Sequence, residues 1–153
     1  MWNVVTKSEN LVNEVLECIE VLTSEAREPP KEFRTRARSL PADLIAHGLQ
    51  YLVALTAARS SKSLIEKGLK GNSCADVVKS IMEEKEFDEV KRSYGLYGGV
   101  LVYLLKRQGV IEEGVSSFRD LLEKLTDPAV EAKSAPIIEW LKRLAEAYIT
   151  TTE

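Results

Sequence analysis

The sequence is poor in several features on which whole classes of protein depend. Among its 153 residues it has one histidine and two cysteines, with no CxxC pair. A single histidine excludes metal sites built on paired histidines, such as HExxH. The longest uncharged runs, Leu44–Ala58 and Ser93–Leu105, are shorter than the roughly 18–20 apolar residues that span a bilayer. We therefore expect no transmembrane helix, no metal site and no bound cofactor.

The two cysteines, Cys18 and Cys74, lie far apart in the chain, and neither has a neighbouring histidine. Their spacing indicates neither a disulfide framework nor a zinc site. We expect both to be small buried hydrophobic residues. The first residues also lack the basic start, apolar stretch and cleavage site of a secretory signal, so the cytoplasm is the expected location.

Helical periodicity is the strongest pattern that the sequence does have. Hydrophobic residues make up 44% of the chain and charged residues 29%, which is typical of a globular protein. No alternation typical of β-strands competes with the helical spacing, so the sequence predicts an all-α fold, a compact single-domain bundle of six to eight helices over residues 1–153. Apolar residues recur three and four positions apart in segments 7–26, 31–38, 41–59, 62–67, 73–82, 96–108, 117–125 and 134–148.

Capping pairs predict where several of these helices begin. A hydroxyl residue is followed three positions later by an acidic one at Thr6–Glu9, Ser73–Asp76 and Ser117–Asp120. The last helix is expected to begin at Ser134–Pro136, after Asp127-Pro128 has closed the helix before it.

The segment 41–59 is predicted to be one helix. Ser39 is expected to cap its N-terminus. Gly48 falls in its middle, where glycine costs roughly 1 kcal/mol relative to alanine, so we expect it to permit the close approach of another helix. The predicted core stripe consists of Leu44, Ile45, Leu49, Leu52 and Leu55.

Three glycines in SYGLYGGV, Gly95, Gly98 and Gly99, have the spacing of a phosphate-binding loop. No strand precedes them and no GK[ST] follows, so we expect them to serve helix packing or a kink. Asp43 and His47 stand one helical turn apart, which is the arrangement of an oriented general base. The sequence supplies no nucleophile for such a base, and a lone helical histidine is more often a surface or interface residue.

Charge is distributed unevenly along the chain. The totals of 21 basic and 24 acidic residues argue against a polyanionic partner. The segment 27–62, however, contains seven basic and three acidic residues, whereas residues 1–26 contain one lysine and five glutamates. An acidic protein can therefore still have one basic face.

Lys31, Arg34 and Arg38 follow one another at i, i+3 and i+7, which places them on one side of a helix. Together with Arg36, Arg59 and Lys62 they could follow a phosphate backbone. The alternative is an ordinary solvated helix surface, because Glu32 is placed to pair with Arg36.

Two motifs extend this interpretation. Residues 37–49 read ARSLPADLIAHGL, close to an ARxLPxxIxxxGL pattern with Ile45 preceded by Leu44, and residues 137–147 read IIEWLKRLAEA. The first is the core of the segment from Arg34 to Lys62, which resembles the signature of the small helical subunit of the Cmr complex, the type III-B CRISPR RNA-silencing ribonucleoprotein. The closing lysine of that signature would fall at Lys62. The second is similar to the C-terminal EWLKRFA helix of the same family, with Leu144 where an aromatic residue is common. Residues 63–133 match the family only in helical character.

The resemblance implies a non-catalytic subunit in antiviral defence, with cleavage performed by other subunits. It implies stacking with copies of itself, as a filament, along guide RNA and target RNA, beside RAMP-type backbone subunits. The alternative is a protein-interaction helical bundle without an RNA role. Carried over by position, the candidate RNA-facing cations are Arg34, Arg36, Arg38, Lys62, Lys142 and Arg143. For the last two, the competing interpretation is pairing on the helix surface, of Lys142 with Glu146 and of Arg143 with Glu139.

Overall fold

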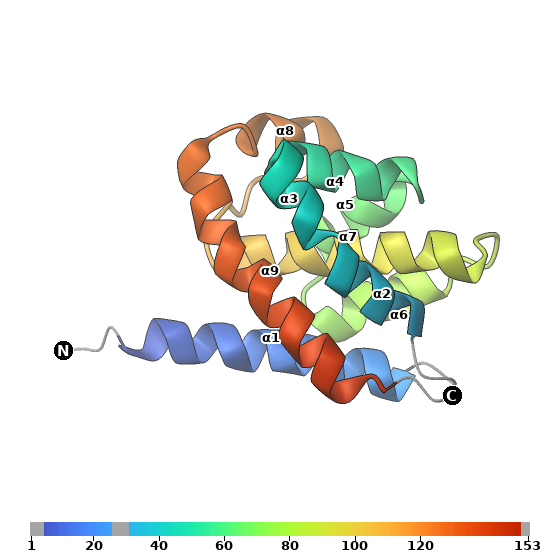
Figure 1. Ribbon diagram of the computed structural model, residues 1–153. Coiled ribbons are helices and arrows are strands. Elements are labelled where there is room, and N and C mark those ends of the chain that lie inside the picture. Colours follow the sequence, from blue (N-terminus) through green and yellow to red (C-terminus); the bar gives the residue numbers. More distant parts are fainter. Residues whose placement is uncertain (1–4, 26–30, 151–153) are drawn as a thin grey trace.

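The computed structural model describes residues 5–25 and 31–150, and these residues form a bundle of helices without a strand (Figure 1). The prediction of an all-α bundle is confirmed. In chain order the helices are α1 (Val5–Glu25), α2 (Lys31–Ser39), α3 (Pro41–His47), α4 (Leu49–Ala58), α5 (Lys62–Lys70), α6 (Cys74–Met82), α7 (Glu89–Arg107), α8 (Phe118–Lys124) and α9 (Pro128–Tyr148).

Helix α7 is the centre of the bundle. It contacts α1, α2, α4, α5, α6 and α9, and every residue from Ser93 to Val102 is buried. A helix that is apolar on all sides is suited only to such a central position. These six helices cover α7, whereas α3 packs against α2 and α4, and α8 packs against α4 and α5. Helix α1 lies along one side of the bundle, where it packs against α6 and α9 (Figure 1).

Glycines allow α5 and α7 to approach each other closely. Gly68 of α5 faces Gly99 of α7, and a Cβ atom added to Gly68 would collide with the backbone carbonyl oxygen of Gly99. Gly98 is crowded by Thr56 and Ile65 in the same way. The prediction that the SYGLYGGV glycines serve helix packing is confirmed.

The prediction of one helix over 41–59 is wrong, because the chain breaks at Gly48. This residue has φ +92°, in the region that favours glycine, and α3 ends before it while α4 begins after it. The side chain of Glu131 in α9 takes over the role of an N-cap by accepting a hydrogen bond from the Leu49 amide at 2.9 Å.

The break also corrects two smaller predictions. Ile45 turns out to be 87% exposed and is not a core residue, because α3 is too short and too peripheral to bury a whole stripe. Ser39 is the last residue of α2, and the residue that precedes α3 is Leu40, which makes no side-chain cap hydrogen bond.

The predicted caps at Ser73 and Ser117 are confirmed, since each hydroxyl accepts a hydrogen bond from the amide of the expected acidic residue at 3.1 Å. The Thr6–Glu9 pair lies outside the described side chains, although α1 already includes Thr6. The expected start of the last helix is wrong. Asp127 caps α9 and Pro128 is in its first turn, so Pro136 lies inside the helix.

The expectation that the cysteines do not pair is also wrong. Cys18 of α1 and Cys74 of α6 form a disulfide, with their Cα atoms 5.4 Å apart. Both residues are buried, as predicted. Sequence spacing could not reveal the pair, because it depends on how α1 packs against α6.

Among the described residues, no helix is long and apolar enough to cross a bilayer.

Candidate nucleic-acid interface

Helix α2 lies on the outside of the bundle, against α7 and α9 (Figure 1). Its residues Phe33 and Ala37 are buried, so the remaining sides of the helix are available for charged residues. Three predicted cations belong to this helix. Arg34 and Arg38 lie on the same side of the helix as Lys31, and Arg36 lies on the opposite flank beside Glu32.

On the α9 flank, one carboxylate joins two of the predicted cations. Glu146 accepts Arg38 Nε at 3.0 Å through one oxygen and Arg143 Nη1 at 3.2 Å through the other. Arg143 also donates from Nε to Glu139 at 2.8 Å. Arg38 and Arg143, far apart in the sequence, are therefore neighbours in the fold.

The hydrogen bonds to Glu139 and then to Glu146 raise the pKa of Arg143, so this side chain stays charged throughout the accessible pH range. The predicted pairing of Arg143 with Glu139 is confirmed, whereas the predicted pairing of Lys142 with Glu146 is wrong, because among the described residues that carboxylate pairs with Arg38 and Arg143. Since Arg38 and Arg143 are both more than half exposed, each keeps part of its guanidinium group accessible to a partner in solution.

On the other flank, Arg36 lies over an aromatic ring. Its guanidinium carbon is 4.5 Å from the centre of the Tyr94 ring in α7, and one of its terminal nitrogens is 3.7 Å from Glu32. Arg59, which follows α4, reaches the same ring at 5.5 Å and donates from Nη1 to the Tyr94 hydroxyl at 3.2 Å. The structure thus groups Arg36 with Arg59.

Sequence reasoning missed Tyr94 altogether. Nothing in the local pattern of α7 indicates an aromatic contact with arginines more than thirty positions earlier. Only the packing of α2 and α4 against α7 brings these residues together.

The other predicted cations lie apart from these two groups. Arg34 is partly buried, and its Nε has no hydrogen-bond partner among the residues that the structure describes. Lys62 is exposed at the first position of α5, and Lys142 is partly exposed on α9. Within the described ranges, no ion pair involves any of the three.

The Asp43–His47 pair does not form an oriented base in the described part of the chain, where no hydrogen bond joins the two side chains. His47 is exposed and its ring lies 4.6 Å from that of Tyr51. The described residues also contain no group of three histidine, cysteine or acidic side chains suited to a metal ion.

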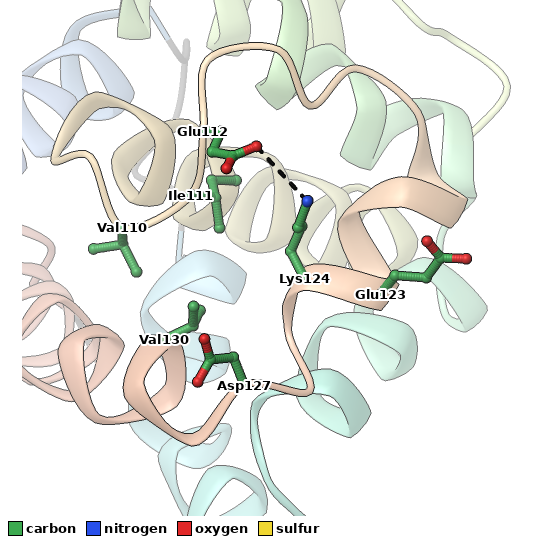
Figure 2. Close-up of a pocket in the computed structure, with 7 residues that line it drawn as sticks. All are labelled: Val110, Ile111, Glu112, Glu123, Lys124, Asp127 and Val130. Atoms are coloured by element: carbon green, nitrogen blue, oxygen red, sulfur yellow. Dashed lines mark ion pairs between the residues drawn. The ribbon is translucent and has the colours of Figure 1, made fainter.

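A pocket of about 380 Å³ lies between the end of α7, α8 and the start of α9 (Figure 2). Lys124 pairs with Glu112 across it at 3.7 Å. Because three carboxylates accompany this single lysine, the pocket is a poor site for a phosphate group. It is lined by Val110, Ile111, Glu112, Glu123, Lys124, Asp127 and Val130, none of which belongs to α2.

Comparison with known proteins adds no further information. No protein-family model matches the chain, and neither a curated protein nor a solved structure is detectably similar to it. Its function is therefore argued from its own residues.

Proposed function

We propose that this chain is the non-catalytic small subunit of a Cmr-type, type III-B CRISPR ribonucleoprotein that binds along guide RNA and target RNA. The observation that supports the proposal most directly is a contact. The two segments that resemble this family, 37–49 and 137–147, touch each other through Arg38, Glu146 and Arg143. Segments that serve one interface are expected to lie together, whereas unrelated chance matches need not.

The charges around α2 are suited to RNA held by its backbone. Arginines lie on both flanks of the helix, near α9 on one side and near Tyr94 on the other. Such cations can contact phosphates without reading bases, and base pairing between guide and target then supplies the sequence specificity. We therefore expect RNA binding that is independent of sequence and sensitive to salt.

The proposed complex also requires protein contacts, with RAMP-type subunits and with copies of this chain. Head-to-tail stacking needs two different surfaces, because only a heterologous interface can continue as a filament. The structure offers exposed apolar side chains in two places, Ile45 and Tyr51 on the consecutive helices α3 and α4, and Trp140 and Tyr148 on α9. The same exposed residues favour the second candidate function, a protein-interaction bundle without an RNA role.

The proposal places the chain in the cytoplasm, where disulfides are rare outside hyperthermophiles. The Cys18–Cys74 pair must then either stay oxidised there or be dispensable for the fold.

The test is recovery of the tagged chain from its own cells at two salt concentrations, with identification of the retained proteins and RNA. We expect guide RNAs and RAMP-type partners, and we expect the triple variant R34E/R36E/R38E to lose most of the RNA. In a binding assay, each lost phosphate contact should lower the slope of log affinity against log salt by about 0.7 to 0.9.

The matched control is R119E. Arg119 is 91% exposed on α8, so its reversal lowers the net charge by two, as each single reversal in the triple variant does, without touching α2. Recovery with protein partners but no RNA at either salt would favour the second candidate, and an unchanged salt slope in the triple variant would reject the α2 face.

A further inference from the structure

Two arginines from different parts of the chain contact the ring of Tyr94. Arg36 comes from α2 and Arg59 from the turn after α4, and each guanidinium carbon lies within 5.5 Å of the ring centre. Tyr94 itself is only 7% exposed, so the ring is a fixed platform between the two charges. Cation–π contacts of this kind hold a guanidinium group in one orientation.

The two guanidinium groups have little negative charge to balance them. The only described carboxylate near Arg36 is Glu32, and their separation of 3.7 Å is longer than a hydrogen bond. The Arg36 side chain is 14% exposed, and its buried Nε has no hydrogen-bond partner among the described residues. Arg59 is exposed and, within the same residues, makes its side-chain hydrogen bond to Tyr94 alone.

This arrangement is unfavourable when nothing is bound. Two like charges that share one ring repel each other. An oxyanion at the ring edge would offset this repulsion, because guanidinium groups donate several hydrogen bonds in a geometry that matches phosphate.

We infer that Arg36 and Arg59 form a phosphate-binding site at the edge of Tyr94. The ligand is a phosphate group, and its source, which rests on the proposed function, is the backbone of a single RNA strand. Lys62 is exposed at the start of α5, three residues after Arg59, and adds positive charge in the same part of the chain. Tyr94 thereby joins the predicted interface, together with Arg59, which the charge pattern had already grouped with Arg36.

A purely structural role is the rival explanation, because the same stack ties α2 and the end of α4 to α7. The two roles differ in what an anion does. If the stack is purely structural, added phosphate leaves the two arginine side chains unchanged. If it is a binding site, the arginine side chains respond to added phosphate, and the response weakens when one of the two charges is removed.

The first experiment is a titration of the full chain with inorganic phosphate, followed by NMR of the arginine Nε–H signals. We expect the Arg36 and Arg59 signals to shift and saturate. In Arg59→Gln, which keeps a donor for the Tyr94 hydroxyl but removes the charge, the response of Arg36 should weaken at least five-fold. Arg119→Gln is the matched control and should respond like the unmodified chain.

Folding is checked with the same samples. Arg59 is exposed, so Arg59→Gln should keep its melting temperature. A phosphate response that survives Arg59→Gln unchanged, or that never appears, would overturn the site.

The second experiment replaces phosphate with a 12-nucleotide single-stranded oligouridylate. If RNA is the source, Arg59→Gln should lower the salt slope by about 0.7 and the oligonucleotide should displace phosphate. Saturable phosphate binding without RNA binding would keep the anion site and reject the proposed function. RNA binding with an unchanged slope in Arg59→Gln, and no phosphate response, would keep the proposed function and reject this site.

Discussion

Helices α7 and α2 touch each other, yet different forces define them. In α7 an unbroken run from Ser93 to Val102 is buried, and glycines set its distance from α5. In α2 only Phe33 and Ala37 are buried, and arginines occupy both flanks. Shape therefore decides which side chains α7 can accept, whereas charge decides what α2 can bind.

The contrast separates stability from function. A single methyl group added to α7, or to a helix at its contact with α7, should lower the free energy of unfolding by several kcal/mol, because a close-packed interior has no space for it. A charge changed on the α2 surface should hardly alter stability, since exposed ion pairs contribute little, but it should alter binding.

The largest effect is expected for Gly68→Ala. The new methyl group would collide with the Gly99 carbonyl, and backbone cannot move aside as a side chain can. We expect a loss of about 3 kcal/mol or more of unfolding free energy in urea. Gly114→Ala is the control, because its methyl group meets no atom within 4 Å. Equal stability of the two variants would contradict the close α5–α7 contact.

The next effect concerns the disulfide between α1 and α6, both of which pack on α7. Reduction, or the double change Cys18→Ser with Cys74→Ser, should destabilise the fold by roughly 2–3 kcal/mol, because the cross-link restricts the unfolded chain. The measurement is thermal unfolding with and without a reducing agent. The melting temperature of the double variant should not depend on the reducing agent. If the melting temperature of the wild-type chain is also unchanged by the agent, the two cysteines are not paired.

Tyr97→Phe should stabilise the fold by about 1 kcal/mol, because the buried Tyr97 hydroxyl has no hydrogen-bond partner among the residues that the structure describes. Burial also raises the pKa of Tyr97 above its ordinary value of 10. The folded state thus holds this proton more tightly, and its contribution to stability is full below about pH 10 and lost as the pH rises further.

Urea unfolding at pH 7 and pH 10.5 measures both effects. The phenylalanine variant should lose less stability between the two pH values than the unmodified chain. An equal loss would mean that Tyr97 does not contribute to alkaline unfolding.

The smallest effect on stability is expected on the α2 side. Glu146→Gln removes the carboxylate shared by Arg38 and Arg143, and the free energy of unfolding should change by less than about 0.5 kcal/mol. RNA should bind about two-fold more tightly, because both arginines are released for phosphate. Glu123→Gln, which frees Arg119 on α8, is the control and should leave RNA affinity unchanged.

Much of the fold could be predicted from local pattern. The helical class, the caps at Ser73 and Ser117 and the packing role of the α7 glycines all follow from spacing and residue type. Predictions failed where a distant partner intervened. Gly48 ends α3 with a positive φ, and Glu131 from α9 then caps α4, which no pattern within 41–59 could indicate.

The candidate interface shows the same division. Sequence reasoning identified the arginines of α2 as a group and identified the pairing of Arg143 with Glu139. It could not show that Arg38 shares Glu146 with Arg143, nor that Tyr94 lies between Arg36 and Arg59.

The sequence by itself determined the helical class, most helix positions and the concentration of basic charge near α2, because these depend on neighbours within one or two turns. Tertiary structure alone decided the disulfide, the break at Gly48 and the long-range partners of Arg36, Arg38 and Arg59. The physical reason is range. Periodicity and capping act over a few residues, whereas ion pairs, stacking and cross-links depend on which helix surfaces meet once the core has packed around α7.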